Sequence, residues 1–268
     1  MALIYNATFD KNTRKLSFED KAGNEIYSFT VPERGPAVDD ITKPLTFKAT
    51  QDGSTVKLSR EGSIYSNFQT SRDGGNTWED YTLDTDITLN TGDEVSFRVK
   101  KNRSPYQYAM APCKFEIRRG KIEAWHNVMS MYRKDDFATY DTAVGSVFAY
   151  LFENCTSLTK APVLPATTLA DSCYTYMFSG CQSLTKAPEL PATALAQSCY
   201  STMFYGCRSL KEVRISATTT STSALNNWLN NVSATGDFYC DPNATIFPTG
   251  VSGIPANWRR LNINDYPN

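Results

Sequence analysis

Tyr176-Met-Phe-Ser-Gly-Cys-Gln-Ser-Leu184 returns one period later as Thr202-Met-Phe-Tyr-Gly-Cys-Arg-Ser-Leu210. A more divergent copy, Tyr150-Leu-Phe-Glu-Asn-Cys-Thr-Ser-Leu158, precedes both, so the period is 26 residues. A fixed period of this size is typical of solenoid proteins. One unit cannot bury its apolar face alone, and neighbouring copies therefore stack. The repeat favours a binding surface or a structural spacer over an enzyme.

The segment between the copies also recurs. Lys160-Ala-Pro-Val-Leu-Pro165 returns as Lys186-Ala-Pro-Glu-Leu-Pro191, and its prolines favour extended backbone. Residues 169–178 have helical spacing, which predicts a helix with one buried face formed by Leu169, Cys173, Tyr176 and Met177. We therefore expect each repeat to contain one helix and one short extended segment.

The rest of the chain divides by its local patterns. Alternating residues predict a three-stranded β-meander in an N-terminal module, residues 1–35, which a linker follows at residues 36–44. Short strands between turn residues predict a β-sandwich over residues 45–128. The solenoid is expected over residues 129–239, and a C-terminal cap over residues 240–268. The predicted fold class is therefore α+β and multidomain.

Composition excludes some classes of partner. The 268 residues contain 27 Lys and Arg against 28 Asp and Glu, with no basic block that would favour a nucleic acid. No apolar run is long enough for a membrane-spanning helix, so we expect no membrane insertion. The first residues also lack the basic and apolar regions of a signal peptide. We therefore expect a chain that is made in a cytoplasm and either stays there or leaves it by a route other than secretion.

Seven cysteines are present, and five of them recur at matching phases of the repeat: Cys155, Cys181 and Cys207 in one set, Cys173 and Cys199 in another. Their spacings are not those of zinc sites, and the chain has one histidine that could add to a set of metal ligands. An odd number argues against a complete disulfide framework. We expect small buried side chains stacked in two columns. Disulfides and a metal site are the alternatives, and we predict neither metal nor cofactor.

Ser71-Arg-Asp-Gly-Gly-Asn-Thr-Trp78 matches the Asp-box pattern S-x-D-x-G-x-T-W. Asp73 and Gly75 favour a tight hairpin turn, and Trp78 is expected to anchor it. Sialidases carry several such boxes in a propeller, whereas this chain has one box in a region too short for a propeller. The motif therefore predicts a structural hairpin.

Catalytic patterns are weak. The chain has no P-loop, GxGxxG or HExxH motif, and no catalytic residue is predicted. His126, the one histidine, is expected beside Trp125 at a strand end. Asp135 and Asp136 predict a solvated loop, with a Ca²⁺ contact as the alternative.

Binding candidates come from recurrence and from loops. Tyr174 and Tyr200 share one repeat phase, as do Lys160 and Lys186. The tyrosines would present flat rings to a sugar or a protein, or serve as partly buried spacers; the lysines would bind or be solvated. Further candidates are Tyr205 in the third copy and, in a long loop of the sandwich, Tyr106 and Tyr108.

The phrase Met-Phe-x-Gly-Cys-x-Ser-Leu-x-x-Ala-Pro-x-Leu-Pro-Ala-Thr resembles the BspA-type leucine-rich repeat, over residues 143–215. Residues 71–82 and 87–98 are similar to the β-module that often precedes such repeats, and residues 228–240 and 253–258 to their usual C-terminal ending. The family is abundant in proteins of gut bacteria and of the phages that infect them. The resemblance implies a leucine-rich-repeat solenoid with an adhesive or interaction role and no catalytic residues.

Together these features predict a non-enzymatic phage virion structural protein, a head or tail fibre or a decoration protein. Its N-terminal module would bind other virion proteins, and its solenoid would bind a host surface protein or glycan. We expect a homo-oligomer. One alternative is a bacterial cell-surface adhesin, and a second is an accessory module of a carbohydrate-active enzyme.

Overall fold

The chain forms two compact units, Met1–Val38 and Asp39–Pro267. The structure is a computed structural model that describes residues 6–10, 15–22, 24–30, 39–60, 68–102, 113–221 and 223–266. The two units are described separately.

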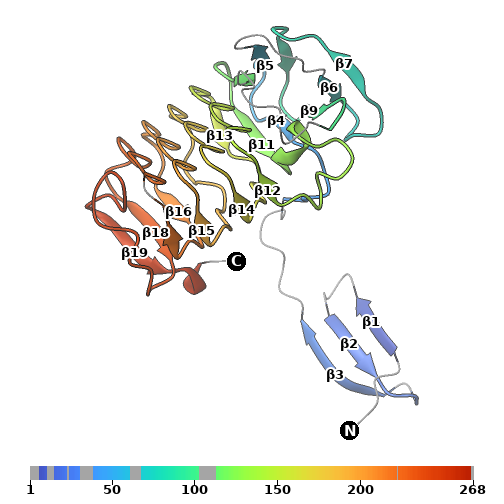
Figure 1. The fold of residues 1–268 in the computed structure, drawn as a ribbon. Helices are drawn as coiled ribbons and strands as arrows, with labels where there is room; N and C mark the ends of the chain where they lie inside the picture. The colour runs from blue at the N-terminus through green and yellow to red at the C-terminus, as the bar shows by residue number, and fades with distance from the viewer. Residues whose placement is uncertain are drawn as a thin grey trace. The chain divides into compact units, whose positions relative to one another are not determined.

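The N-terminal unit is a three-stranded antiparallel sheet in the order β1-β2-β3 (Figure 1). Its strands are β1 (Asn6–Asp10), β2 (Lys15–Glu19) and β3 (Glu25–Thr30). Between β2 and β3, Asp20 Oδ1 accepts hydrogen bonds from the backbone N–H groups of Ala22 and Asn24, at 2.8 and 3.0 Å. This side-chain closure is a common way to form a tight turn.

The second unit begins with a two-layer β-module. Its strands are β4 (Thr46–Ala49), β5 (Ser54–Arg60), β6 (Phe68–Ser71), β7 (Glu79–Tyr81), β8 (Ile87–Leu89), β9 (Glu94–Val99), β10 (Cys113–Glu116) and β11 (Ile122–Trp125). One sheet has the order β10-β5-β8, and the other β13-β11-β4-β9-β6-β7, in which β13 (Leu158–Lys160) comes from the following part of the chain. The layers meet where Phe115 contacts Phe47 and Phe97, with ring centroids 4.7 and 5.1 Å apart.

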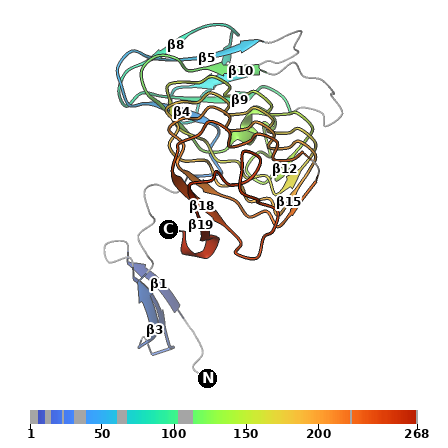
Figure 2. The ribbon, with the colours of Figure 1, turned by 90° about the vertical axis from the view of Figure 1, so that its left-hand side faces the viewer.

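A stack of repeating rungs follows (Figure 1). Its short strands are β12 (Thr142–Ala143), β13 (Leu158–Lys160), β14 (Thr168–Leu169), β15 (Ala194–Leu195), β16 (Glu212–Arg214), β17 (Thr219–Thr220), β18 (Gly236–Cys240) and β19 (Trp258–Asn262). Strand β13 pairs in parallel with β11, so the larger sheet of the β-module continues into the stack. Two 3₁₀ helices, η1 (Val128–Met131) and η2 (Ile263–Asp265), complete the unit. Figure 2 shows successive rungs lying over one another.

The α+β prediction is wrong, because the described residues contain no α-helix and the repeats form a β-solenoid-like stack. Residues 171–180, which include most of the predicted helix, are consecutive turns after the two-residue strand β14. Alternate backbone N–H groups donate to carbonyls of the next rung: Tyr174 N–H to Cys199 O at 3.0 Å and Tyr176 N–H to Ser201 O at 3.1 Å. The N–H groups between them bond within the rung, as from Met177 to Tyr174 at 3.1 Å.

A backbone conformation with a four-residue period explains this departure. The left-handed region is occupied at every fourth residue of four segments: Ser146, Tyr150, Asn154; Ser172, Tyr176, Gly180; Ser198, Thr202, Gly206; and Ser223, Asn227, Asn231. An α-helix needs negative φ throughout, so these residues exclude it. We call residues 146–154, 172–180, 198–206 and 223–231 the turn segments, and their solvent-facing side the turn face.

The interior of the stack consists of columns of like side chains. Phe152, Phe178 and Phe204 stack with centroids 5.3 and 5.6 Å apart and ring planes within 3°. A second column contains Phe148, Tyr174, Tyr200 and Trp228. Such regular contacts reproduce, rung by rung, the packing that a single unit cannot provide.

Residues after β18 cover the last rung. Trp228 Nε1 donates to the carbonyl of Gly253 at 2.9 Å, and Phe247 stacks on the Trp228 ring with centroids 6.5 Å apart. Trp258 Nε1 donates to Ser233 O at 2.8 Å. The apolar end of the column is thereby buried, as a terminal unit of a solenoid requires.

Candidate functional site

The surface of the parallel strands, here called the strand face, carries charged side chains in pairs. It comprises β11, β13, β16, β18 and β19 together with the intervening Lys186. The pairs are Lys160–Asp39 at 2.8 Å, Lys186–Glu212 at 3.0 Å, Arg259–Asp237 at 2.6 Å, and Arg214–Glu189. Each cation therefore already has an anionic partner from within the chain.

Lys160, a candidate binding residue, lies in such a pair. Its Nζ is 3.0 Å from the ring centroid of Trp125 and contacts both carboxylate oxygens of Asp39. Burial lowers the pKa of Lys160, while the hydrogen bonds and charge of Asp39 oppose the shift. The ammonium group thus connects Asp39 to β11 and β13 and is already occupied by these contacts.

Lys186, the second candidate lysine, lies near the C-terminus. Its Nζ is 4.7 Å from the ring centroid of Tyr266, and the guanidinium of Arg214 is 4.8 Å from the same ring. The Tyr266 hydroxyl donates to Glu212 at 2.8 Å. Burial raises the pKa of Tyr266 to about 12, although the hydrogen bond with Lys186 lowers it. Tyr266 therefore covers part of the strand face.

The two recurring tyrosines lie inside the stack. Tyr174 and Tyr200 are each 1% exposed, and burial raises the pKa of both phenols. The hydroxyl of Tyr174 has no hydrogen-bond partner among the described residues. A ligand at the surface cannot stack on either ring.

The repeat cysteines also lie in buried columns. Cys155, Cys181 and Cys207 donate Sγ–H to the carbonyls of Phe115, Phe152 and Phe178, at 3.0 to 3.1 Å. Cys173 and Cys199 form the second column. All five are free thiols, and burial raises their pKa values. They therefore serve packing rather than nucleophilic chemistry, which needs a thiolate.

Aromatic rings do reach the surface on the turn face. Tyr150 and Tyr176 stack with centroids 4.9 Å apart and planes within 10°, and both are half-buried. Tyr205, a candidate binding residue, is 40% exposed. Ser, Asn and Gly accompany these rings in the turn segments. Antibody binding sites use the same mixture, in which tyrosine provides rigid contact area and the small polar residues adaptable hydrogen bonds.

The fourth turn segment adds amide groups to this surface. The side chains of Asn226, Asn227, Asn230 and Asn231 form no hydrogen bond within the described part of the chain. Asn227 and Asn231 have φ of 51° and 58°, a conformation that asparagine tolerates better than most residues. Asn226 and Asn230 are not under this constraint. Their amides leave donors and acceptors open to solvent.

The Asp-box forms a rigid hairpin between β6 and β7. Asp73 accepts hydrogen bonds from Ser71 Oγ at 2.6 Å and from Thr77 N and Oγ1 at 2.9 and 2.7 Å, which lower its pKa. Trp78 Nε1 donates to Gly75 O at 2.8 Å, and Arg98 lies 4.0 Å above the Trp78 ring. The polar groups of the motif are thus used within the turn itself.

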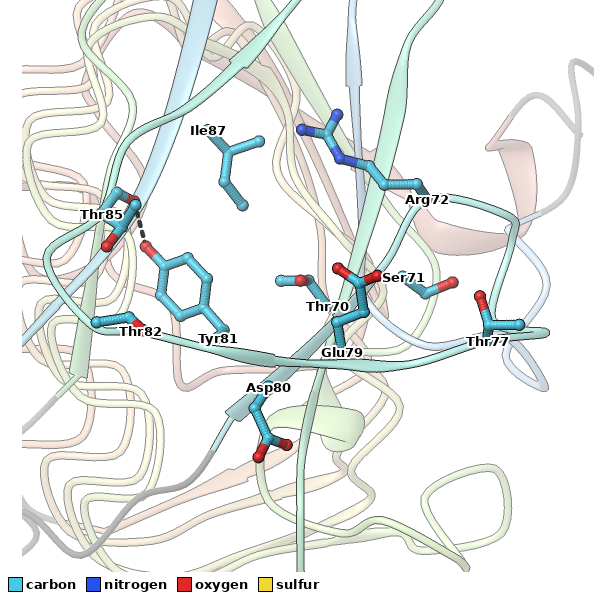
Figure 3. Close-up of a pocket in the computed structure, with 10 residues that line it drawn as sticks. All are labelled: Thr70, Ser71, Arg72, Thr77, Glu79, Asp80, Tyr81, Thr82, Thr85 and Ile87. Atoms are coloured by element: carbon cyan, nitrogen blue, oxygen red, sulfur yellow. Dashed lines mark hydrogen bonds between the residues drawn. The ribbon is translucent and has the colours of Figure 1, made fainter.

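A hollow of about 360 Å³ lies beside this hairpin (Figure 3). Figure 3 shows Arg72 and Glu79 on one side of the β7 ribbon and Asp80 on the other. Asp80 pairs with Lys100 at 2.5 Å, and the Tyr81 hydroxyl donates to the carbonyl of Thr85. The polar groups of Asp80, Tyr81 and Ser71 are bonded within the chain, and we assign the hollow no chemistry.

The remaining candidates are Tyr106, Tyr108, His126 and Asp136. Tyr106 and Tyr108 belong to residues 103–112, outside the described residues. His126 Nδ1 accepts from the backbone of Asp40 at 3.2 Å, and Asp136 pairs with Arg133. Among the residues that the structure describes, no cluster could hold a metal ion and no helix is long and apolar enough to cross a membrane.

The structure places two kinds of residue on the turn face that the repeat pattern did not predict there: the tyrosines Tyr150 and Tyr176, and the asparagines of residues 226–231. The recurrence of Tyr150 at Tyr176 was a usable signal, since it marks one column. No protein-family model, curated protein or solved structure matches the chain.

Proposed function

We propose that the chain is a non-enzymatic structural protein of a phage particle, a head or tail fibre or a decoration protein. The N-terminal unit attaches it to other virion proteins, and the solenoid displays an adhesive surface to a host cell or to mucus. The proposal is supported above all by the division of the chain into a small β-unit and a much larger stack. This arrangement suits separate attachment and display.

The stack also suits display because its rungs hold surface residues in fixed columns. Backbone hydrogen bonds between rungs, such as those from Thr202 to Asn226 at 2.8 Å and from Gly206 to Asn230 at 2.9 Å, set the position of each column. Binding surfaces on such a scaffold lose little conformational entropy on contact.

Purified particles test this function. Mass spectrometry of gradient-purified virions should identify the chain at a stoichiometry typical of structural proteins, and antibodies against residues 39–267 should label intact particles in electron micrographs. Absence of the chain from particles that retain their other structural proteins would contradict the proposal.

A bacterial cell-surface adhesin is the second candidate, favoured by the resemblance of the repeats to those of the BspA type. Surface labelling of bacteria that carry the gene but produce no particles separates the two. Labelled cells without virions would support the adhesin, whereas labelling confined to virions would support the phage protein.

A further inference from the structure

Exposed hydrogen-bonding groups gather around Tyr205 at the end of the turn face. Gly180 N donates to Tyr205 O at 2.7 Å and Gly206 N to Asn230 O at 2.9 Å, so Tyr205 lies directly between the second and fourth rungs. Thr202 N donates to Asn226 O at 2.8 Å, three residues earlier. Asn230 therefore lies beside Tyr205 on the adjacent rung, and Asn226 lies on that same rung beside Thr202.

These three side chains are not used by the fold. Tyr205 is 40% exposed, and its hydroxyl has no partner among the described residues. The amides of Asn226 and Asn230 are likewise unpaired there. By contrast, the strand face satisfies its polar groups internally through the ion pairs at Lys160 and Lys186.

The surroundings indicate the chemistry of a ligand. The four turn segments contain one charged residue, Glu153, which pairs with Lys114 at 2.5 Å. The exposed large apolar side chains of the described residues are Ile41, Tyr205 and Val251, and of these Tyr205 alone belongs to the turn segments. Around Tyr205 the surface offers one exposed ring among uncharged polar groups, rather than the continuous apolar core that a protein interface normally has. An uncharged ligand rich in hydroxyl groups matches it better.

We propose that Tyr205, Asn226 and Asn230 bind a neutral glycan. The C–H face of a sugar ring packs on the Tyr205 ring, and the sugar hydroxyls exchange hydrogen bonds with the two amides and the phenol. This inference rests on the proposed function in assigning an adhesive role to the solenoid, and it names the ligand class of that surface.

The test uses the full chain on a glycan panel and then in calorimetry. The panel contains neutral oligosaccharides ending in galactose, N-acetylglucosamine, fucose or mannose, with sialylated and sulfated counterparts. We expect binding to at least one neutral oligosaccharide. Failure to bind any of them, or binding confined to the anionic ones, overturns the proposal.

Variants locate the site. Tyr205→Ala and the double variant Asn226→Ala/Asn230→Ala should each weaken binding of the selected oligosaccharide about tenfold or more. Tyr205→Phe should retain most of the affinity, because the ring remains. The alanine changes avoid the left-handed positions Asn227 and Asn231, so folding is preserved. Equal thermal unfolding midpoints confirm this.

Two controls lie outside the site. Asn257→Ala removes an exposed amide near the C-terminus, and Arg208→Gln removes an exposed charge shortly after the third turn segment; both should bind like the unmodified chain. Affinity that persists in Tyr205→Ala and in the double variant overturns the assignment. A negative glycan result with the chain still present in virions defeats this inference alone, whereas binding without incorporation defeats the virion role alone.

Discussion

The strand face and the turn face arise from the same repeats, yet they treat their polar groups in opposite ways. On the strand face, Lys160, Lys186, Arg214 and Arg259 have carboxylate partners. On the turn face, the Tyr205 phenol and the amides of Asn226 and Asn230 have no partner among the described residues. The difference teaches that a repeat can devote one surface to its own cohesion and leave another open to a ligand.

The largest effect should come from the core beneath both faces. Phe178→Ala removes a fully buried ring between Phe152 and Phe204 and should lower the free energy of unfolding by about 3–5 kcal/mol. Tyr176→Asn, two residues away on the turn face, should cost about 1 kcal/mol or less. Denaturant titration of both variants measures the difference. Similar losses of unfolding free energy would contradict the assignment of Phe178 to the core and of Tyr176 to the surface.

Alkaline pH should destabilise the column of thiols under the turn face. Burial raises the pKa of Cys155 and of Cys207 to about 12, from 9.0 for a free thiol. The folded pKa exceeds the unfolded one, so their stabilising contribution is complete below pH 9 and is lost as pH rises toward 12. Each thiol should steepen the decline by about 1.4 kcal/mol per pH unit. Urea titrations across this range should show a shallower slope in Cys207→Ala, and an unchanged slope would refute the cause.

Left-handed backbone should make the turn face sensitive to a small substitution. Gly206 has φ of 72°, and an added Cβ would meet no atom closer than 3.9 Å. Gly206→Ala therefore isolates the conformational cost, about 1–2 kcal/mol. Gly206→Asn should lose less, because asparagine occupies this region more readily. If thermal unfolding ranks the two variants in the reverse order, the backbone explanation fails.

Ion pairs of the strand face should contribute least to stability. A double-mutant cycle with Lys186→Met and Glu212→Gln should give a coupling of about 0.2–1 kcal/mol, because both groups are solvent-accessible. The coupling should shrink in high salt. A coupling of several kcal/mol, insensitive to salt, would show that these charges hold the stack together.

Much of the stacking was predictable from the period of 26 residues and from the prolines of the extended segments. The predicted helices failed because buried positions that recur every four residues are hard to distinguish from a helical period of 3.6. The left-handed backbone of Ser172 and Tyr176 could not be predicted from the sequence, because serine and tyrosine rarely adopt this conformation. Gly180 and Gly206, which fitted a helix end equally well, were the available signal.

Taking the four-residue period for a helical one also gave the wrong positions for the tyrosines. A helix buries Tyr176 and leaves Tyr174 outside, whereas the four-residue pattern buries Tyr174 beside Cys173 and turns Tyr176 outward. Tyr205 was identifiable because it follows a buried phenylalanine in the third copy. The amides at Asn226 and Asn230 were not, because the fourth turn segment has almost no sequence identity to the others.

Register between rungs makes the repeat a unit of length. The left-handed positions advance by 26 residues between the first three turn segments and by 25 into the fourth. An in-frame duplication of one repeat would lengthen the stack by one strand spacing, about 4.8 Å, without moving any side chain to the wrong face. Unequal recombination within the gene would therefore adjust the reach of the protein in equal steps.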